Sequence, residues 1–434
     1  MRALDIKKLS VQYHTERGVH RALRDMDLYV EEGEITGIVG ESGSGKTTAM
    51  LAVMGLLDKN STVRSEKVTV CGEPPMPGVN IAMVFQDPQS CLNPTVKIGR
   101  QITETIRTRR HCGWREARER AEELLDMVGI SDGKKRMRQY PFELSGGMRQ
   151  RVVIAIALAC EPKLIIADEP TTALDAAVQA QILRLLKKIV EETGTALLLV
   201  SHDLGVTASL CQRVYVMHEG KIVESGIVED VFYDPQDGYT RQLLSSAKQK
   251  RKNCGSPEDQ VLFRMEHVTK EYNTRDGIRD ISLDLRRGEV FALAGESGSG
   301  KTTLARVLTG ILKEDEGVLY YKGQPLDQKQ RDRSRNKVQM VFQDPYASLN
   351  PCLTVEQALE EALRGADSRD GSQRRRMGTV PARDNAAEKQ SPSARRRDRK
   401  AEREARRKTI CDMLNKVGLT EGYMEKYPSE LSGG

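Results

Sequence analysis

The sequence lacks any apolar run long enough to span a membrane. Its longest such run, 152–160, is far shorter than the ~20 residues that a spanning helix needs. Residues 1–8 contain no apolar signal core, which predicts a protein that is not exported. The eight cysteines are scattered and form no Cys-x-x-Cys pair, so we expect reduced thiols and no zinc or iron–sulfur centre.

The net positive charge of the protein comes from one segment of the chain. Segment 364–408 holds 16 Lys and Arg against 7 Asp and Glu, a net charge of +9, whereas the whole chain carries +6. No aromatic residue is interleaved with these charges, so we expect no binding to nucleic acid. A solvated loop with a charged helix after Ala394 is one interpretation, and contact with anionic lipid headgroups is another.

Four blocks of sequence occur twice, in the same order. The longest, GESGSGKTT, begins at Gly40 and recurs at Gly295, and the others begin at Val84, Leu92 and Glu143 and recur at Val341, Leu349 and Glu430. This pattern predicts a tandem duplication of a domain of about 250 residues. The chain has 434 residues, of which 38% are hydrophobic. This is enough to form more than one hydrophobic core.

The repeat predicts the domain boundaries. We assign 1–246 to the first domain, 247–260 to a linker and 261–434 to the second domain, with 364–408 as an insert in the second copy. The first copy continues for about 100 residues beyond its Leu-Ser-Gly-Gly block, whereas the sequence stops at the second such block. We therefore expect a truncated second domain.

Each GESGSGKTT block has the spacing of a phosphate-binding loop, G-x4-G-K-T. The apolar runs before the blocks, 35–39 and 290–294, predict strands, and the patterns after them predict helices over 49–57 and 304–312. Glycines let backbone N–H groups approach phosphate oxygens, and the helix N-terminus adds a positive dipole end. A chance glycine-rich turn is a poor explanation because the match occurs twice.

Two carboxylates follow the buried-strand pattern at 163–167. Asp168 at the strand end suits Mg²⁺, and Glu169 suits the base that orients or deprotonates the attacking water. A helix-capping Asp-Glu pair is the alternative. Asp175 precedes a further helix pattern, and we expect it either to contact a second domain in a dimer or to cap that helix.

Three more polar side chains follow apolar strands. These are Gln86, Gln343 and His202, which follow the strands predicted at 81–85, 338–342 and 196–200. The carboxyl ends of parallel strands border the ligand cleft in such folds. We expect His202 to contact the γ-phosphate and each Gln to reach Mg²⁺ and the water. A single His or Gln is otherwise most often structural.

The Leu-Ser-Gly-Gly block of the first copy opens a helix pattern. Ser145 is a good N-cap, and Gly146 and Gly147 leave bare N–H groups that suit a second phosphate contact. An ordinary Ser-Gly helix start is the alternative.

In this order and spacing, the motifs resemble those of ATP-binding-cassette (ABC) ATPases. The sequence at 84–94 and 234–244 resembles that of the ATPase subunits of oligopeptide, dipeptide and nickel importers. Residues 237–238 depart from this pattern, because they are Asp-Gly where those proteins have His-Pro. The resemblance implies an α/β fold of two P-loop NTPase domains, each with a RecA-like core, an antiparallel β subdomain and a helical subdomain. It also implies that ATP lies between the phosphate-binding loop of one domain and the Ser-Gly-Gly of the other.

The resemblance assigns a role to each candidate residue. Tyr13 and Tyr272 match the aromatic residue that stacks on adenine, with a strand-face tyrosine as the alternative. The expected catalytic residues are Glu169 and His202, and the expected Mg²⁺ ligands are Thr47, Gln86, Asp168, Thr302 and Gln343. The expected signature residues are Ser145, Gly146, Gly147, Ser432, Gly433 and Gly434. The remaining expected ATP contacts are Gly40, Glu41, Ser42, Gly43, Ser44, Gly45, Lys46, Thr48, Gly295, Glu296, Ser297, Gly298, Ser299, Gly300, Lys301 and Thr303.

The function implied is that of an ATPase that energises an importer for peptides, or for nickel or other metal complexes. Its cofactors would be ATP and Mg²⁺. Because the second domain is expected to be truncated, we expect weak ATP hydrolysis by the chain as it stands. Its partners would be integral membrane permeases and, through them, a solute-binding protein, at the cytoplasmic face of the membrane. A tandem cassette protein that acts on ribosomes is the alternative, but such proteins carry a long charged linker between cassettes, unlike 247–260. A coiled-coil DNA-repair ATPase is disfavoured because no heptad run separates the phosphate-binding loop from Asp168.

Overall fold

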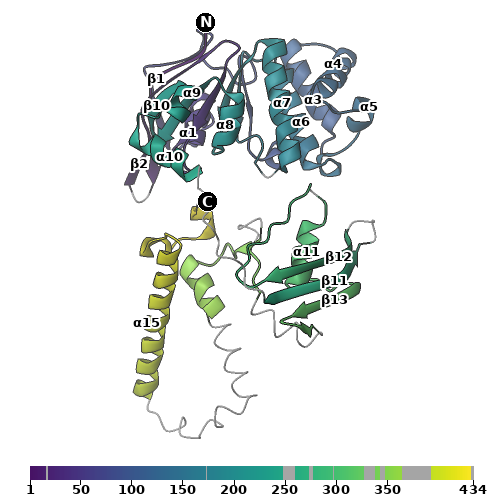
Figure 1. Cartoon of the computed structure of the whole chain (residues 1–434). Coiled ribbons are helices and arrows are strands. Elements are labelled where there is room, and N and C mark those ends of the chain that lie inside the picture. The colour runs from purple at the N-terminus through teal and green to yellow at the C-terminus, as the bar shows by residue number, and fades with distance from the viewer. Residues whose placement is uncertain are drawn as a thin grey trace. The chain divides into compact units, whose positions relative to one another are not determined.

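The structure is a computed structural model (Figure 1). By Cα proximity the chain divides into two units, Met1–Val338 and Gln339–Gly434. The residues described are 1–15, 18–172, 174–247, 260–272, 277–296, 298–326, 338–342, 348–363 and 392–431, without the side chains of 15, 89, 247 and 392–403.

A six-stranded, mainly parallel sheet forms the centre of the first domain. Its order is β10-β9-β3-β8-β7-β6, in which only the edge strand β10 runs antiparallel to its neighbour. Residues in β3, β7 and β8 are buried at every position, as expected for parallel strands covered on both faces. The bounds are β3 Ile35–Val39, β6 Ile81–Val84, β7 Leu164–Asp168, β8 Ala196–Val200, β9 Arg213–His218 and β10 Lys221–Ile227.

An antiparallel sheet packs beside this core. The long strand β1 (Arg2–Thr15) pairs with β2 (Gly18–Glu31) on one side and with β4 (Ser61–Arg64) and β5 (Lys67–Val70) on the other. Its apolar face shares one buried cluster with one face of the parallel sheet. This arrangement confirms the predicted antiparallel β subdomain beside an α/β core.

Helices complete the first domain. α1 follows β3, and α3, α4 and α5 gather at the end of the domain away from β1 and β2 (Figure 1). The apolar faces of α3, α4, α6 and α7 share the second buried cluster of the domain. Their bounds are α1 Lys46–Val53, α2 Pro88–Cys91, α3 Ile98–Arg110, α4 Trp114–Met127, α5 Gly133–Arg136, η1 Pro141–Glu143, α6 Gly146–Ala159, α7 Ala176–Thr193, α8 Leu204–Leu210, α9 Val228–Tyr233 and α10 Gly238–Ala247.

The second copy repeats the antiparallel sheet and the helix after the phosphate-binding loop. The sheet has the order β12-β11-β13-β14, and its small buried cluster includes residues of α11. The bounds are β11 Val261–Glu271, β12 Gly277–Arg286, α11 Lys301–Leu308, β13 Glu316–Tyr321 and β14 Gln324–Pro325.

The strands predicted at 290–294 and 338–342 are wrong for this structure. Neither segment is a strand, and Val290 is 83% and Val341 96% exposed. A strand needs hydrogen-bonded neighbours, and among the described residues no segment pairs with either one. Apolar composition alone was therefore not enough to form a central sheet in this copy.

The Gln339–Gly434 unit is helical where it is described. A helix at 355–363 and α15 (Pro392–Lys416) share a buried cluster with Met424, between η3 (Glu421–Tyr423) and η4 (Pro428–Glu430). The helix predicted after Ala394 is present and begins at Pro392, whereas the loop predicted before it lies outside the described residues. No helix in the described part of the chain is long and apolar enough to cross a membrane.

Candidate functional site

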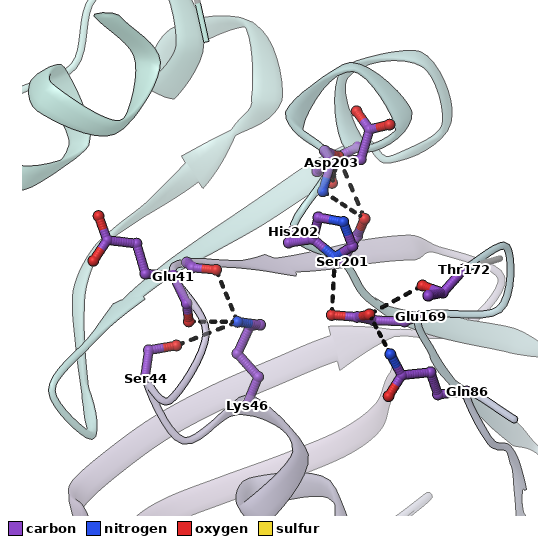
Figure 2. Close-up of polar contacts among 11 residues, drawn as sticks. Glu41, Ser44, Lys46, Gln86, Glu169, Thr172, Ser201, His202 and Asp203 are labelled. Atoms are coloured by element: carbon purple, nitrogen blue, oxygen red, sulfur yellow. Dashed lines mark hydrogen bonds and ion pairs between the residues drawn. The ribbon is translucent and has the colours of Figure 1, made fainter. Parts of the chain in front are cut away.

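The first phosphate-binding loop wraps around the ammonium group of Lys46. Lys46 Nζ donates hydrogen bonds to the carbonyl oxygens of Gly40 and Glu41, both at 2.8 Å, and to Ser44 Oγ at 3.4 Å (Figure 2). The loop joins β3 to α1, and Gly45 at the helix N-cap has φ 101°. The loop therefore forms a preshaped cradle whose cation is held by the backbone.

Glycine is required where the sheet presses on this loop. A Cβ on Gly40, which has φ +154°, would lie 2.2 Å from the carbonyl oxygen of Met217 in β9. A Cβ on Gly45 would lie 2.9 Å from the carbonyl oxygen of Ala22 in β2. Side chains at these positions would push the loop away from both sheets.

Lys46 and Asp168 are buried charged groups that lie close together. Burial lowers the pKa of Lys46, and the charges of Glu169, Asp168 and Glu41 oppose that shift. Burial raises the pKa of Asp168, and a hydrogen bond from the Thr47 side chain opposes that shift. Asp168 Oδ1 is buried without a hydrogen-bond partner among the described residues. An unpartnered carboxylate oxygen beside a threonine hydroxyl fits a hard divalent cation such as Mg²⁺.

The Glu169 carboxylate lies at the end of β7 and accepts hydrogen bonds on both oxygens. Gln86 Nε2 and Thr172 Oγ1 donate to Oε2 at 2.8 Å and 3.0 Å, and His202 Nδ1 lies 3.0 Å from Oε1 (Figure 2). Glu169 has φ 45°, a left-handed conformation that is strained for a residue with a side chain. Its N–H donates to the carbonyl oxygen of Val200, which ties this conformation to β8.

The contact with Glu169 fixes the tautomer of His202. A carboxylate can only accept, so Nδ1 carries the hydrogen and Nε2 is left to face solvent or a ligand. The His202 side chain is 61% exposed, whereas that of Glu169 is 19% exposed. His202 can therefore contact an incoming group while Glu169 holds its ring.

The structure brings five residues predicted from the sequence together at the carboxyl ends of the parallel strands. These are Lys46, Gln86, Asp168, Glu169 and His202. Thr172 was not predicted from the sequence. It lies three residues after Glu169 and orients the Glu169 carboxylate through a hydrogen bond. The spacing Asp-Glu-Pro-Thr-Thr was the available signal, because a hydroxyl three residues after a carboxylate can turn back to it.

The signature helix α6 begins as predicted. The Ser145 side chain accepts a hydrogen bond from the Met148 N–H at 3.3 Å, as an N-cap does. A Cβ on Gly147 would lie 2.5 Å from Val178 in α7, so this start packs closely against α7. Asp175 caps α7 in turn, because its side chain accepts from the Val178 N–H at 2.9 Å.

The second phosphate-binding loop has the same internal geometry. Lys301 Nζ donates to the carbonyl oxygens of Gly295 and Glu296, at 2.7 Å and 2.5 Å, and to Ser299 Oγ at 3.2 Å. Lys301 is less buried than Lys46, which is only 6% exposed. The predicted residues Ser297, Gln343, Ser432, Gly433 and Gly434 lie outside the described part of the chain.

The two candidate adenine-stacking residues lie in comparable places. Tyr13 is half-buried near the end of β1, where it is paired with His20 and Ser61. Tyr272 directly follows β11 and is 39% exposed. The stacking role stays a prediction for both.

Comparison with known families decides the assignment. The family profile described as "ABC transporter" matches twice, at residues 23–172 and 278–434. The chain belongs to the ABC transporter family. It is an ATP-binding chain of the kind that couples ATP hydrolysis to transport, and its mixed α/β fold agrees with this assignment.

Relatives of this ABC chain include proteins named "Glutathione import ATP-binding protein GsiA". Those from Shigella sonnei and Escherichia coli K12 are each 34% identical to this chain over an alignment of 487 positions. The alignment covers 99% of this chain and 73% of the relative. Among solved structures, cbiO1 from Clostridium perfringens is 27% identical, covering 54% of this chain and 91% of that chain with a TM-score of 0.46.

Proposed function

We propose that this chain hydrolyses Mg·ATP to energise the uptake of a small peptide through separate membrane permeases. The observation that carries the proposal is the Glu169 carboxylate, which three side chains orient beside the phosphate-binding loop. The chain would act at the cytoplasmic face of the membrane, and the permeases would connect it to a solute-binding protein.

The roles of the residues follow from their contacts. Lys46 is held at the mouth of a loop of backbone N–H groups, so it would meet the β- and γ-phosphates once ATP displaces its carbonyl partners. Three donors occupy three of the about four acceptor sites of the Glu169 carboxylate, so an attacking water can bind to Oε1 or replace a partner. Gln86 is exposed and is the partner most easily rotated away. Glu169 would then accept the proton of the water, and His202 would contact the γ-phosphate.

Mg²⁺ would be held by Asp168 and Thr47, with Gln86 within reach. When bound, it would neutralise charge on the phosphate oxygens. The support is the buried, unpartnered Oδ1 of Asp168 and the hydrogen bond between Thr47 and Asp168. The equivalent proposal for the second copy rests on Thr302 and Gln343.

The names of the relatives favour a peptide over a metal complex as the solute. Glutathione is a tripeptide, and the GsiA proteins align with almost the whole of this chain. The resemblance of the sequence at 84–94 and 234–244 to oligopeptide, dipeptide and nickel importer ATPases is compatible with this choice.

Uptake of radiolabelled glutathione by cells tests this proposal. Cells that lack the chain are complemented with the wild-type chain, Lys46→Ala or Glu169→Gln. We expect uptake with the wild-type chain, less than a tenth of it with either variant, and retained ATP binding in Glu169→Gln. Uptake of nickel but not peptide would overturn the choice of solute. Sedimentation of the chain with ribosomes and not membranes would overturn its role as a transport ATPase.

A further inference from the structure

The first phosphate-binding loop rests on a part of the chain that none of the nucleotide motifs includes. The Tyr239 hydroxyl, on α10, accepts a hydrogen bond from the Glu41 N–H at 3.1 Å. The two residues are 198 positions apart in the sequence. This contact joins the loop that follows β3 directly to the last helix of the first domain.

A stacked ring holds the Tyr239 side chain in place. The rings of His218 and Tyr239 are 3.9 Å apart between centroids, with an interplanar angle of 23°. His218 is the last residue of β9, which lies beside β3 in the sheet, with Val216 paired to Val39. The ring that supports Tyr239 is therefore fixed to the same sheet from which the phosphate-binding loop emerges.

The turn after His218 contacts the same loop. The Gly220 N–H donates to the carbonyl oxygen of Ser44 at 3.0 Å, and the Arg24 N–H donates to the carbonyl oxygen of Gly220 at 2.9 Å. A Cβ on Gly220 would lie 2.4 Å from the Ala22 carbonyl oxygen. The turn thus fits tightly between β2 and the phosphate-binding loop.

The start of α10 is itself anchored. Glu224 of β10 accepts hydrogen bonds from the N–H groups of Gln236 and Asp237, at 2.7 Å and 3.1 Å. Asp237 Oδ1 accepts in turn from the N–H groups of Tyr239 and Thr240. The Asp-Gly at 237–238, which departs from the His-Pro of related importers, therefore supplies a helix cap that aims Tyr239.

We propose that Tyr239, supported by His218, is a positioning residue for the first ATP site. The Glu41 N–H lies at the entrance of the loop, and its bond to Tyr239 fixes the carbonyl that Lys46 contacts. Fixing this residue keeps the following N–H groups arranged for the phosphates, so less ordering is needed when ATP binds. Burial raises the pKa of Tyr239 above its ordinary value, at which a tyrosine hydroxyl is already protonated at neutral pH.

Tyr239→Phe in the full chain tests the proposal, because it removes the hydroxyl and keeps the ring. Lys301→Ala is included in every protein so that the second loop does not contribute to the signal. We expect the Kd for ATP and for ADP to rise about three- to tenfold, as the loss of one hydrogen bond of about 1 kcal/mol implies. Hydrogen exchange at the Glu41 amide should accelerate, whereas exchange over 35–39 should not change.

The matched control is Tyr233→Phe, since Tyr233 precedes α10 and is 84% exposed. It should leave both Kd values and the exchange of Glu41 unchanged. His218→Ala should reproduce the effect of Tyr239→Phe in part, because it removes the ring support alone. An ATP Kd within twofold of the parent in Tyr239→Phe would overturn the proposal. So would equal acceleration of exchange throughout the domain, which would indicate a loss of stability only.

Discussion

At the residue scale, the first site holds two charged groups through three contacts each, the Lys46 ammonium and the Glu169 carboxylate. Lys46, Asp168 and Glu169 were predictable because each occupies a fixed place after an apolar strand, and parallel strands bring such places to one edge. Tyr239 was not predictable as a support for the loop, because its partner lies 198 positions away in the sequence. Contacts of this kind depend on tertiary packing and leave no local pattern.

Two buried side chains should make the free energy of unfolding depend on pH in the alkaline range. Burial raises the pKa of Cys211 and of Tyr215 to about 12, from 9.0 and 10.0. Above pH 9 the unfolded chain loses these protons while the native state keeps them, so the free energy of unfolding falls as pH rises towards 12. Urea titrations between pH 8 and pH 11 measure this slope.

Cys211→Ala is the matched variant for the alkaline titration. It should flatten the slope just above pH 9 and leave the contribution of Tyr215, which starts about one pH unit higher. Cys352 is exposed, so a maleimide should modify it in the native state while Cys211 reacts only after unfolding. A slope that Cys211→Ala leaves unchanged would contradict this assignment.

At the element scale, the starts of α6 and α7 were predicted from the sequence, whereas the strands predicted at 290–294 and 338–342 are absent from the structure. Ser145 and Asp175 cap α6 and α7 through contacts within three residues, which a local pattern can specify. The strands at 290–294 and 338–342 depended on neighbours in a sheet, and apolar composition carries no information about neighbours. The α/β fold was predictable as a whole because the order and spacing of the motifs resemble those of ABC ATPases.

Asp175 gives a test at this scale. Asp175→Ala removes the cap of α7 and should lower the free energy of unfolding by about 1 kcal/mol. Asp175→Asn keeps a capping oxygen and should retain most of the stability. Urea unfolding compares the two variants. A dimer-contact role would instead weaken ATP binding in both variants at unchanged stability, which would contradict a purely local cap.

At the scale of the whole molecule, the two phosphate-binding loops differ in their surroundings. Lys46 is buried beside Asp168 and Glu169, whereas Lys301 is more exposed, although both make the same three contacts within their loops. Burial strengthens the attraction between a cation and phosphate by lowering the local dielectric constant. We therefore expect one tighter and one weaker ATP site in each chain.

Calorimetric titration of ATP resolves these sites. Lys46→Ala should remove the tighter site and leave the weaker one, with a Kd about tenfold higher or more. Lys301→Ala should remove only the weaker site. Two sites of equal affinity in the wild-type chain, or loss of both sites in Lys46→Ala, would contradict this expectation.

The apolar segments 290–294 and 338–342 have a consequence for concentrated solutions. Val290, Phe291, Leu293, Val341 and Phe342 are all exposed, and β-branched and aromatic residues that lack strand partners are templates for pairing with another chain. Light scattering should show self-association that grows with protein concentration. Val341→Lys should reduce it, and Val19→Lys, at a position 57% exposed in β2, should not. We therefore expect the solubility of this chain to depend on these two exposed segments.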